Sequence, residues 1–159
     1  MTKEEKKELL LKDICGRLPY GVRVWYKYET WISKKFATSI RLADEKIALS
    51  SKFNKEGDWF PVEEAGEILI KPYLRSISSM TEEEKEELRD TYDWVYSEYP
   101  FDDEDEDEDD LRDLRNVEDV GGHYEPSAET YDWYNRKGFD YRGLIPKGLA
   151  LEAKEGMYN

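Results

Sequence analysis

The chain has 159 residues, 38% hydrophobic and 39% charged, with 24 basic and 38 acidic side chains and a net charge of −14. This length suits one domain with its own core and is short for two, so we expect a single domain over residues 1–159. The single cysteine, Cys15, excludes an intramolecular disulfide. A charged N-terminus and the lack of a long apolar stretch favour a cytoplasmic protein over a secreted or membrane-spanning one.

The first predicted element is a helix from about Lys3 to Cys15. Its apolar residues recur at helical spacing, and Gly16 stands where a helix would end. We expect Cys15 to be a small core residue on the apolar face, because free cysteine is usually buried. The residues at this spacing are Leu10, Leu11, Ile14, Cys15 and Leu18.

From Tyr20 the apolar period becomes alternating, which predicts a half-buried strand over 22–28. Further short strands are predicted around 40–42, 47–49, 59–62 and 68–70, with a turn at 43–46. Pro72 is expected to end the strand region. A helix followed by four or five short strands favours an α+β fold, with a small antiparallel sheet or an SH3-like barrel in residues 1–80.

Residues 81–159 are predicted to be mainly helical. Thr81 and Glu84 have the spacing of a capping box, and apolar residues at helical spacing continue the pattern to Pro100. A short helix around 111–117 and a helix from Ser127 to Lys137 are expected to follow, and residues 139–159 to form an ordered tail across the body. The apolar residues of the capped helix are Leu88, Tyr92, Val95, Tyr96 and Tyr99.

A tetrapeptide, Thr-Tyr-Asp-Trp, occurs at both 91–94 and 130–133. Both copies fall in predicted helices. There tyrosine and tryptophan pack more often than they bind, so the repeat is interpreted as part of the packing.

The C-terminal helices carry an acidic insertion, a run of nine consecutive acidic residues at 102–110 (DDEDEDEDD), without which the net charge would be −5. Such a run cannot bury itself, because each buried carboxylate needs a partner or a proton. It must face water, a cation or a basic partner. Residues 1–80 hold 15 basic and 12 acidic side chains, whereas residues 81–159 hold 9 and 26. The second half therefore repels phosphates and attracts basic ligands.

Three blocks of sequence together resemble a group of small uncharacterised proteins that recur in genomes of gut anaerobes and their phages. The blocks are LLLKDICGRLPYGV (9–22), IKPYLRSISSMTEEEKEEL (70–88) and FDYRGLIPKGLALEAKEGMYN (139–159). The resemblance implies a phage or mobile-element setting and carries no activity, ligand or catalytic residue with it. The chain departs from the group's pattern over 95–125, so the resemblance does not explain the acidic run.

The sequence offers few residues for catalysis. His123 is its only histidine, so a Ser-His or Cys-His pair and a zinc site lack ligands or a second candidate. The loop at 143–148 lacks the Lys-Ser/Thr of a phosphate loop, and the acidic run lacks the glycine of an EF-hand loop. We therefore expect no enzyme activity, no cofactor and no dedicated metal site.

Three functions remain open. In the first, the protein is a DNA mimic whose carboxylates occupy a basic groove on a host defence or nucleic-acid-handling protein, with neighbouring aromatic rings as apolar anchors. The opposing interpretation is that these rings form the core face of the capped helix and that the run is a solvated loop. The expected partner-binding residues are Asp102, Asp103, Glu104, Asp105, Glu106, Asp107, Glu108, Asp109, Asp110, Trp94, Tyr99 and Phe101.

The second function is a small nucleic-acid-binding barrel, in which basic residues and exposed aromatic rings hold a single strand. The acidic run would then compete with nucleic acid for the basic patch. The third is a structural component of a phage particle, for which the sequence has no distinguishing signal. The residues expected for the second function are Arg23, Trp25, Lys27, Trp31, Lys34 and Lys35.

Overall fold

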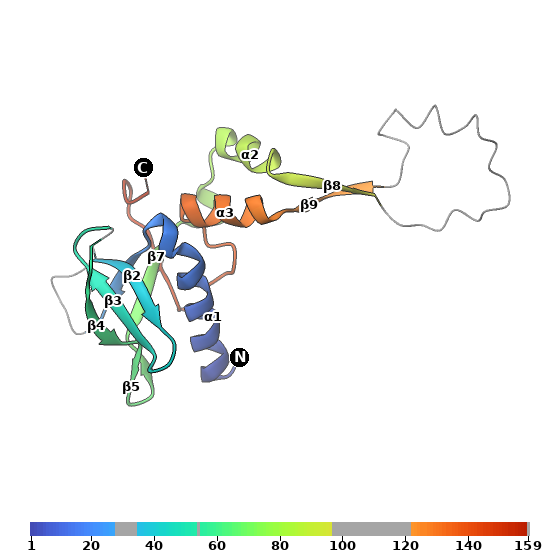
Figure 1. Ribbon diagram of the computed structural model, residues 1–159. Helices are drawn as coiled ribbons and strands as arrows, with labels where there is room; N and C mark the ends of the chain where they lie inside the picture. Colours follow the sequence, from blue (N-terminus) through green and yellow to red (C-terminus); the bar gives the residue numbers. More distant parts are fainter. Residues whose placement is uncertain (28–34, 54, 97–121, 159) are drawn as a thin grey trace, which may run out of the picture.

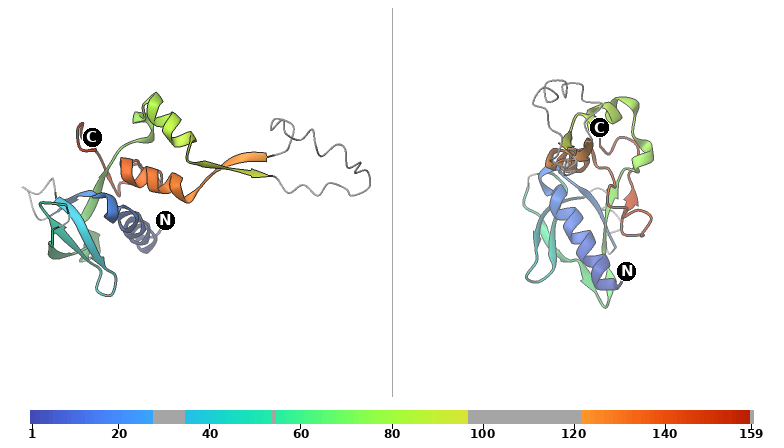
Figure 2. Two further views of the ribbon diagram at one scale, coloured as in Figure 1. Left: turned by 45° about the horizontal axis from the view of Figure 1, so that its top comes forward. Right: turned by 90° about the vertical axis from the view of Figure 1, so that its right-hand side faces the viewer.

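The computed structural model of the protein describes residues 1–27, 35–53, 55–96 and 122–158. These residues form an α+β fold, as predicted. Helix α1 (Lys3–Arg17) packs against a six-stranded sheet (Figure 1). Helices α2 (Glu82–Arg89) and α3 (Ala128–Lys137) lie beside one another. A two-stranded ribbon extends from them away from the sheet, as Figures 1 and 2 show.

The six strands have the order β10-β7-β1-β2-β3-β4. Neighbouring strands are antiparallel, except that β10 is parallel to β7. The small hairpin β5–β6 connects β4 to β7. The bounds are β1 (Arg23–Tyr26), β2 (Lys35–Arg41), β3 (Lys46–Ser50), β4 (Asp58–Pro61), β5 (Glu63–Glu64), β6 (Glu67–Ile68), β7 (Ile70–Leu74) and β10 (Leu151–Glu152).

The described strands form an open sheet and not the closed barrel that was one of the two predicted forms. Leu69, which follows the β5–β6 hairpin, links the residue after β4 to the residue after β1. Its N–H donates to the carbonyl of Val62 at 2.8 Å, and its carbonyl accepts from the N–H of Lys27 at 2.9 Å. Across the described residues the edges β4 and β10 stay apart.

Helix α1 begins at a capping box in which the Thr2 hydroxyl and the Glu5 carboxylate each accept a backbone N–H. Its buried face packs on the inner side chains of the sheet, and the alternation predicted for β1 is confirmed. The resulting core contains Leu10, Leu11, Ile14, Val22, Val24, Tyr26, Ala37, Ile47, Leu49, Val62, Leu69 and Ile70.

Two predictions for α1 are wrong. Cys15 is exposed, because it lies about 100° round the helix from the buried Ile14 and so leaves the core face. Gly16 does not end the helix, which continues to Arg17. A Cβ at Gly16 would lie 3.3 Å from the side-chain nitrogen of Asn135, so the glycine allows α1 to approach α3 closely.

Pro72 lies inside β7 and does not end the strand region, contrary to the prediction. The N–H of Ala153 donates to the carbonyl of Leu74 at 2.7 Å, so the even-numbered residues of β7 face β10. Pro72 faces the same side, but the register of β10 begins opposite Tyr73. The N–H that proline lacks therefore removes no ladder hydrogen bond.

The helix that Thr81 caps ends at Arg89, and its predicted continuation to Pro100 is wrong. Residues Tyr92–Tyr96 form strand β8, which pairs with β9 (Gly122–Pro126). Aromatic and β-branched residues favour a strand, and Tyr92, Trp94 and Tyr96 alternate in the sequence, although Tyr92, Val95 and Tyr96 also have helical spacing. The first Thr-Tyr-Asp-Trp copy thus enters a strand. The helix predicted around 111–117 lies outside the described residues.

Helix α3 and the tail agree with prediction. Ser127 caps α3, and Gly138 ends it with a φ of 78°, a conformation that suits glycine. The tail places Phe139 and Leu144 in fully buried positions and adds β10 to the sheet. The Asp140 carboxylate shapes the turn between them by accepting the N–H groups of Leu144 and Ile145.

A buried ion pair fastens the tail to α1. Arg17, 1% exposed, donates to both carboxylate oxygens of the fully buried Asp13, at 2.7 and 3.0 Å. The same guanidinium donates to the carbonyl of Phe139 at 2.7 Å. The bonds are charge-assisted and lie in the interior, so both groups depend on one another.

Asp13→Ala is expected to lower the free energy of unfolding by about 3–5 kcal/mol, because it leaves the Arg17 guanidinium buried without its counter-charge. Urea denaturation followed by circular dichroism measures the loss. The control is Asp44→Ala, which breaks the exposed ion pair with Arg41 and should change the midpoint little. Equal losses for the two variants would contradict the prediction.

Candidate functional site

Of the predicted partner-binding residues, the structure describes Trp94 alone. Trp94 lies on β8, whereas Asp102–Asp110, Tyr99 and Phe101 lie outside the described residues. The segment that contains them, residues 97–121, joins Tyr96 to Gly122. These two residues are paired across the ribbon, at its end far from α2 and α3 (Figure 1). The acidic run therefore belongs to the connection between β8 and β9.

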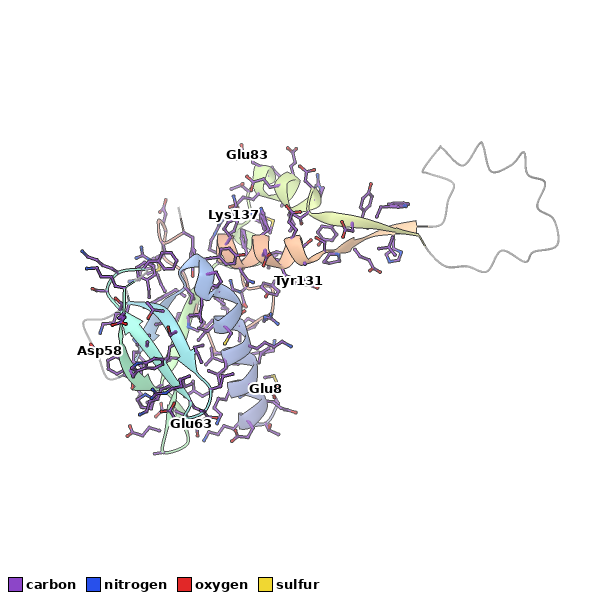
Figure 3. The ribbon with its side chains drawn as sticks, viewed as in Figure 1. Glu8, Asp58, Glu63, Glu83, Tyr131 and Lys137 are labelled. Carbon is purple, nitrogen blue, oxygen red and sulfur yellow. The ribbon has the colours of Figure 1, made fainter. Side chains whose placement is uncertain are left out.

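Acidic and basic side chains are unevenly distributed between two parts of the chain. We define the arm as residues 81–137, which run from the cap of α2 through the ribbon to the end of α3, and the body as the rest. The arm holds 23 acidic and 6 basic side chains, a net charge of −17, whereas the body holds 15 and 18, a net charge of +3. Figure 3 shows Glu83 among the acidic residues on the outside of α2.

The two threonines of the repeated tetrapeptide meet at the base of the arm. Thr91, which precedes β8, and Thr130 of α3 are buried, and their hydroxyl oxygens are 2.9 Å apart. The carbonyl of Thr91 accepts the Thr130 hydroxyl at 3.0 Å and the Ser127 hydroxyl at 2.6 Å. The Thr130 oxygen in turn accepts the N–H of Ser127 at 2.9 Å. This cluster fixes where the ribbon leaves the two helices.

Two glutamates of α2 attach it to the rest of the molecule. The Glu87 carboxylate accepts hydrogen bonds from the Lys137 ammonium at 2.7 Å and from the Trp133 indole N–H at 3.1 Å. Both of these residues belong to α3. Glu84 accepts both terminal nitrogens of Arg75, which follows β7, at 2.7 and 2.9 Å. Lys137 lowers the pKa of Glu87, and Arg75 lowers that of Glu84. Figure 3 labels Lys137 at this junction.

Aromatic rings continue from this base onto the ribbon. Burial, and then the neighbouring Tyr92, raise the pKa of Tyr134 to about 12. Trp94 and Tyr124 are directly opposite in the ribbon, with ring centres 4.8 Å apart in an edge-to-face arrangement. Tyr124 is 63% exposed. The ribbon thus presents an aromatic pair within the acidic arm.

Residues expected for the alternative nucleic-acid-binding function do not gather into one free basic patch among the described residues. Arg23 lies over the ring of Phe36, and Lys35 over the ring of Phe60. Lys27 is ion-paired with Glu67. Trp25, on β1, is half-buried, whereas Trp31 and Lys34 lie outside the described residues.

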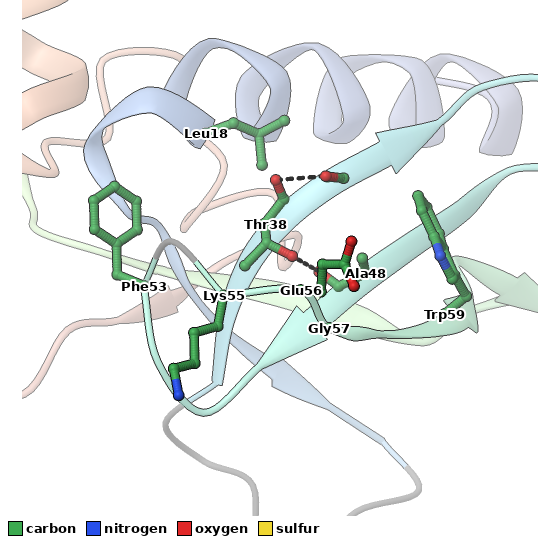
Figure 4. A pocket seen from close by; sticks show the side chains of 9 residues that line it. Leu18, Thr38, Ala48, Phe53, Lys55, Glu56, Gly57 and Trp59 are labelled. Carbon is green, nitrogen blue, oxygen red and sulfur yellow. Dashed lines mark hydrogen bonds between the residues drawn. The ribbon is translucent and has the colours of Figure 1, made fainter.

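A separate hollow of about 430 Å³ lies over β2, β3 and β4 (Figure 4). Figure 4 shows Phe53 and Trp59 on either side of Thr38, whose hydroxyl donates to the carbonyl of Ala48 at 3.3 Å. Among the described residues, no histidine or cysteine lines it. The lining residues are Leu18, Thr38, Ser39, Ala48, Phe53, Lys55, Glu56, Gly57 and Trp59.

Within the residues that the structure describes, no group of three or more His, Cys, Asp or Glu side chains is placed to hold a metal ion. His123 lies on β9 and pairs with Glu125 at 2.6 Å. No described helix is both long enough and apolar enough to cross a membrane.

Sequence reasoning missed Tyr124 and the Thr91–Thr130 contact. The repeated tetrapeptide was a signal for the second, but the two copies meet only because one enters a strand and the other a helix. Tyr124 had no signal, because its partner strand lies 26 residues earlier in the chain, measured from Tyr96 to Gly122.

No protein-family model, no curated protein and no solved structure matches this chain.

Thr130→Val is expected to lower the free energy of unfolding by about 1–3 kcal/mol, because it leaves the Ser127 N–H without its acceptor and removes the Thr130 hydroxyl from the buried Thr91. Amide hydrogen exchange should quicken first in β8 and β9. The control, Thr38→Val, removes one partly buried hydrogen bond in the sheet. Faster exchange of the ribbon in the control as well would argue against the cluster as its anchor.

Glu84→Gln is expected to remove a pH-dependent part of the stability. Arg75 lowers the pKa of Glu84 below its ordinary value of 4.5. The ion pair therefore stabilises the fold fully above pH 4.5, and this stabilisation is lost as the pH falls through the lowered pKa. The stability difference between wild type and variant should therefore shrink in acid. Urea unfolding at pH 7 and at pH 3 measures it, with the exposed Glu86→Gln as control. A difference that is constant with pH contradicts the ion pair.

Proposed function

We propose that this protein is a non-enzymatic interaction protein that acts in the cytoplasm of a bacterial host. Its arm presents the acidic run at 102–110 to the basic surface of a nucleic-acid-handling protein and occupies that surface as a DNA mimic. The concrete form is a phage or mobile-element accessory protein that inhibits a host defence protein. One observation carries the proposal, namely that the arm has a net charge of −17 while the body has a net charge of +3.

The spacing of the charges supports mimicry. An extended chain advances about 3.3–3.6 Å per residue, so an acidic run in that conformation would carry about one charge per 3.4 Å of length, which is the axial charge density of one DNA strand. A basic groove that binds one strand by its charge therefore attracts such a run. A concentrated field also accelerates encounter with a basic partner and weakens as salt is added.

The attachment of the acidic run to the β8–β9 ribbon supports its role as a binding segment. The segment that contains it begins and ends at the paired residues Tyr96 and Gly122. The ribbon that carries these residues is fixed at its base by the buried Thr91–Thr130 contact. Anchoring both ends lowers the conformational entropy that binding must remove.

The two alternatives have weaker support. A nucleic-acid-binding sheet needs available cations, but Lys27 is ion-paired and Arg23 and Lys35 lie over aromatic rings. The net charge of −14 also opposes phosphate binding. A structural role in a phage particle has no observation in its favour.

Neutralising five acids of the run (Asp105→Asn, Glu106→Gln, Asp107→Asn, Glu108→Gln and Asp109→Asn) is expected to weaken capture of partner proteins about tenfold or more, because close charge pairs at an interface are each worth roughly 1.5 kcal/mol or more. Capture is measured by passing bacterial lysate over the immobilised full chain. Captured proteins should elute with a duplex oligonucleotide at an ionic strength at which sodium chloride alone does not release them.

The matched control neutralises five exposed acids of the body and reaches the same net charge of −9. It should capture partners as the wild type does. Equal loss in both variants would show that net charge alone is responsible, and elution by salt as readily as by the oligonucleotide would contradict mimicry. The control substitutions are Glu8→Gln, Glu56→Gln, Asp58→Asn, Glu64→Gln and Glu155→Gln.

A further inference from the structure

We propose that the outer edge of β8 receives an extended segment of the partner as a third strand, and that apolar and basic residues alternate along this segment. The inference rests on the proposed function, since it takes the partner to be basic. It adds the place of contact, the backbone conformation of the partner and the pattern of its side chains.

The β8–β9 ribbon has an aromatic face and an acidic face. Trp94 is directly opposite Tyr124, and Asp93 is directly opposite Glu125. Side chains of opposite residues share a face and successive residues alternate between faces. Tyr92, Trp94 and Tyr124 therefore lie on one face of the ribbon, and Asp93 and Glu125 on the other.

The acidic face places like charges next to one another. Residues directly opposite in an antiparallel pair have Cβ atoms about 4.5–5.5 Å apart, and like charges there are destabilising. On the same strand, the Glu125 carboxylate lies 2.6 Å from Nε2 of His123. Among the described residues, no basic side chain is ion-paired with Asp93. A basic residue on a strand next to β8 would lie beside Asp93 and relieve the repulsion.

The outer edge of β8 is open to another strand. No strand of the described residues pairs with it. Its sequence, Tyr-Asp-Trp-Val-Tyr, has high strand propensity and lacks the lysine or proline that usually protects an edge. The other edge, β9, is interrupted by Gly122 and Pro126 at its ends. A two-stranded ribbon is marginally stable in water, and a third strand strengthens it.

A hollow of about 760 Å³ continues the aromatic face at the base of the ribbon. Tyr92 and Tyr124 line it together with Leu88, so it suits an apolar side chain. Lys85, Arg89 and Asp90 also line it, so its lining carries two positive charges and one negative charge, and the positive excess disfavours a further cation there. A third strand would therefore direct its apolar residues to this face and its basic residues to the face of Asp93.

Charge selects the occupant. A second copy of this chain would bring two arms of net charge −17 together, which is unfavourable. A basic segment is attracted by the acidic run and matched by Asp93 and Glu125. The geometry thus points to a basic partner with a period of two, and not to self-association.

The test uses fluorescein-labelled peptides and the full chain, with binding measured by fluorescence anisotropy at low salt. One peptide alternates (Lys-Val-Lys-Ile-Arg-Val-Lys), and a second has the same composition in two blocks (Val-Ile-Val-Lys-Lys-Arg-Lys). The alternating peptide should bind about tenfold more tightly. N-methylation of alternate amides on the side that pairs should remove this advantage, because strand addition requires main-chain hydrogen bonds.

Asp93→Asn should weaken binding of the alternating peptide about two- to fivefold without lowering the melting temperature, because the substitution removes a repulsion from the free protein. A purely structural role of Asp93 would instead lower both. Glu129→Gln, which changes the same charge on the exposed side of α3, should leave the affinity unchanged.

The outcomes separate the inference from the proposed function. Equal affinity for the alternating and block peptides overturns strand addition, and the attraction of both to the acidic run then stands. In the variant with five neutralised run residues, both peptides should lose affinity by a similar factor. If neither peptide binds the wild type at low salt, the inference and the proposed attraction are contradicted together.

Discussion

Phe139 lies where three parts of the chain meet, and the placement of the arm depends on its contacts. Its ring stacks on Trp133 of α3 at 5.5 Å, and the guanidinium of Arg75, after β7, lies 4.2 Å from its centre. Its carbonyl accepts a hydrogen bond from the buried Arg17 of α1. Arg75 also donates hydrogen bonds to Glu84 of α2. The body therefore contacts α3 through the Phe139 ring and α2 through Arg75. Removing any one contact loosens the base from which the ribbon extends.

The distribution of charge follows from the cost of burying it. Carboxylates without partners cannot enter a core, so a chain with 38 acidic residues must place most of them at the surface. The body stays near neutrality and can pack, while the arm carries the surplus. Within the arm, Glu84 and Glu87 each accept a hydrogen bond from a cation that belongs to another element. At the base of the arm, negative charge therefore stabilises the fold, whereas further out it is left for solvent or a partner.

Local signals predicted the elements whose sequence allows one conformation. The caps at Ser127 and Gly138 and the alternation over β1 were sufficient for α3 and β1. The segment at 90–96 fits a helix and a strand equally well, and only pairing with β9, distant in the chain, decides between them. The acidic run could be predicted as a surface feature from composition alone. The aromatic partner of Trp94 and the contact between Thr91 and Thr130 could not, because both depend on that pairing.

The same negative charge explains why an unprotected edge is tolerated. A strand such as β8, aromatic and without lysine or proline, is a hazard for pairing between copies of a chain. Two copies of this arm repel one another, so the charge that we propose to attract a basic partner also disfavours pairing of β8 with a second copy of itself. Charge density alone attracts many basic surfaces and distinguishes few of them. The proposed pairing of an alternating segment with the aromatic and acidic faces of one ribbon would supply the specificity that the acidic run lacks.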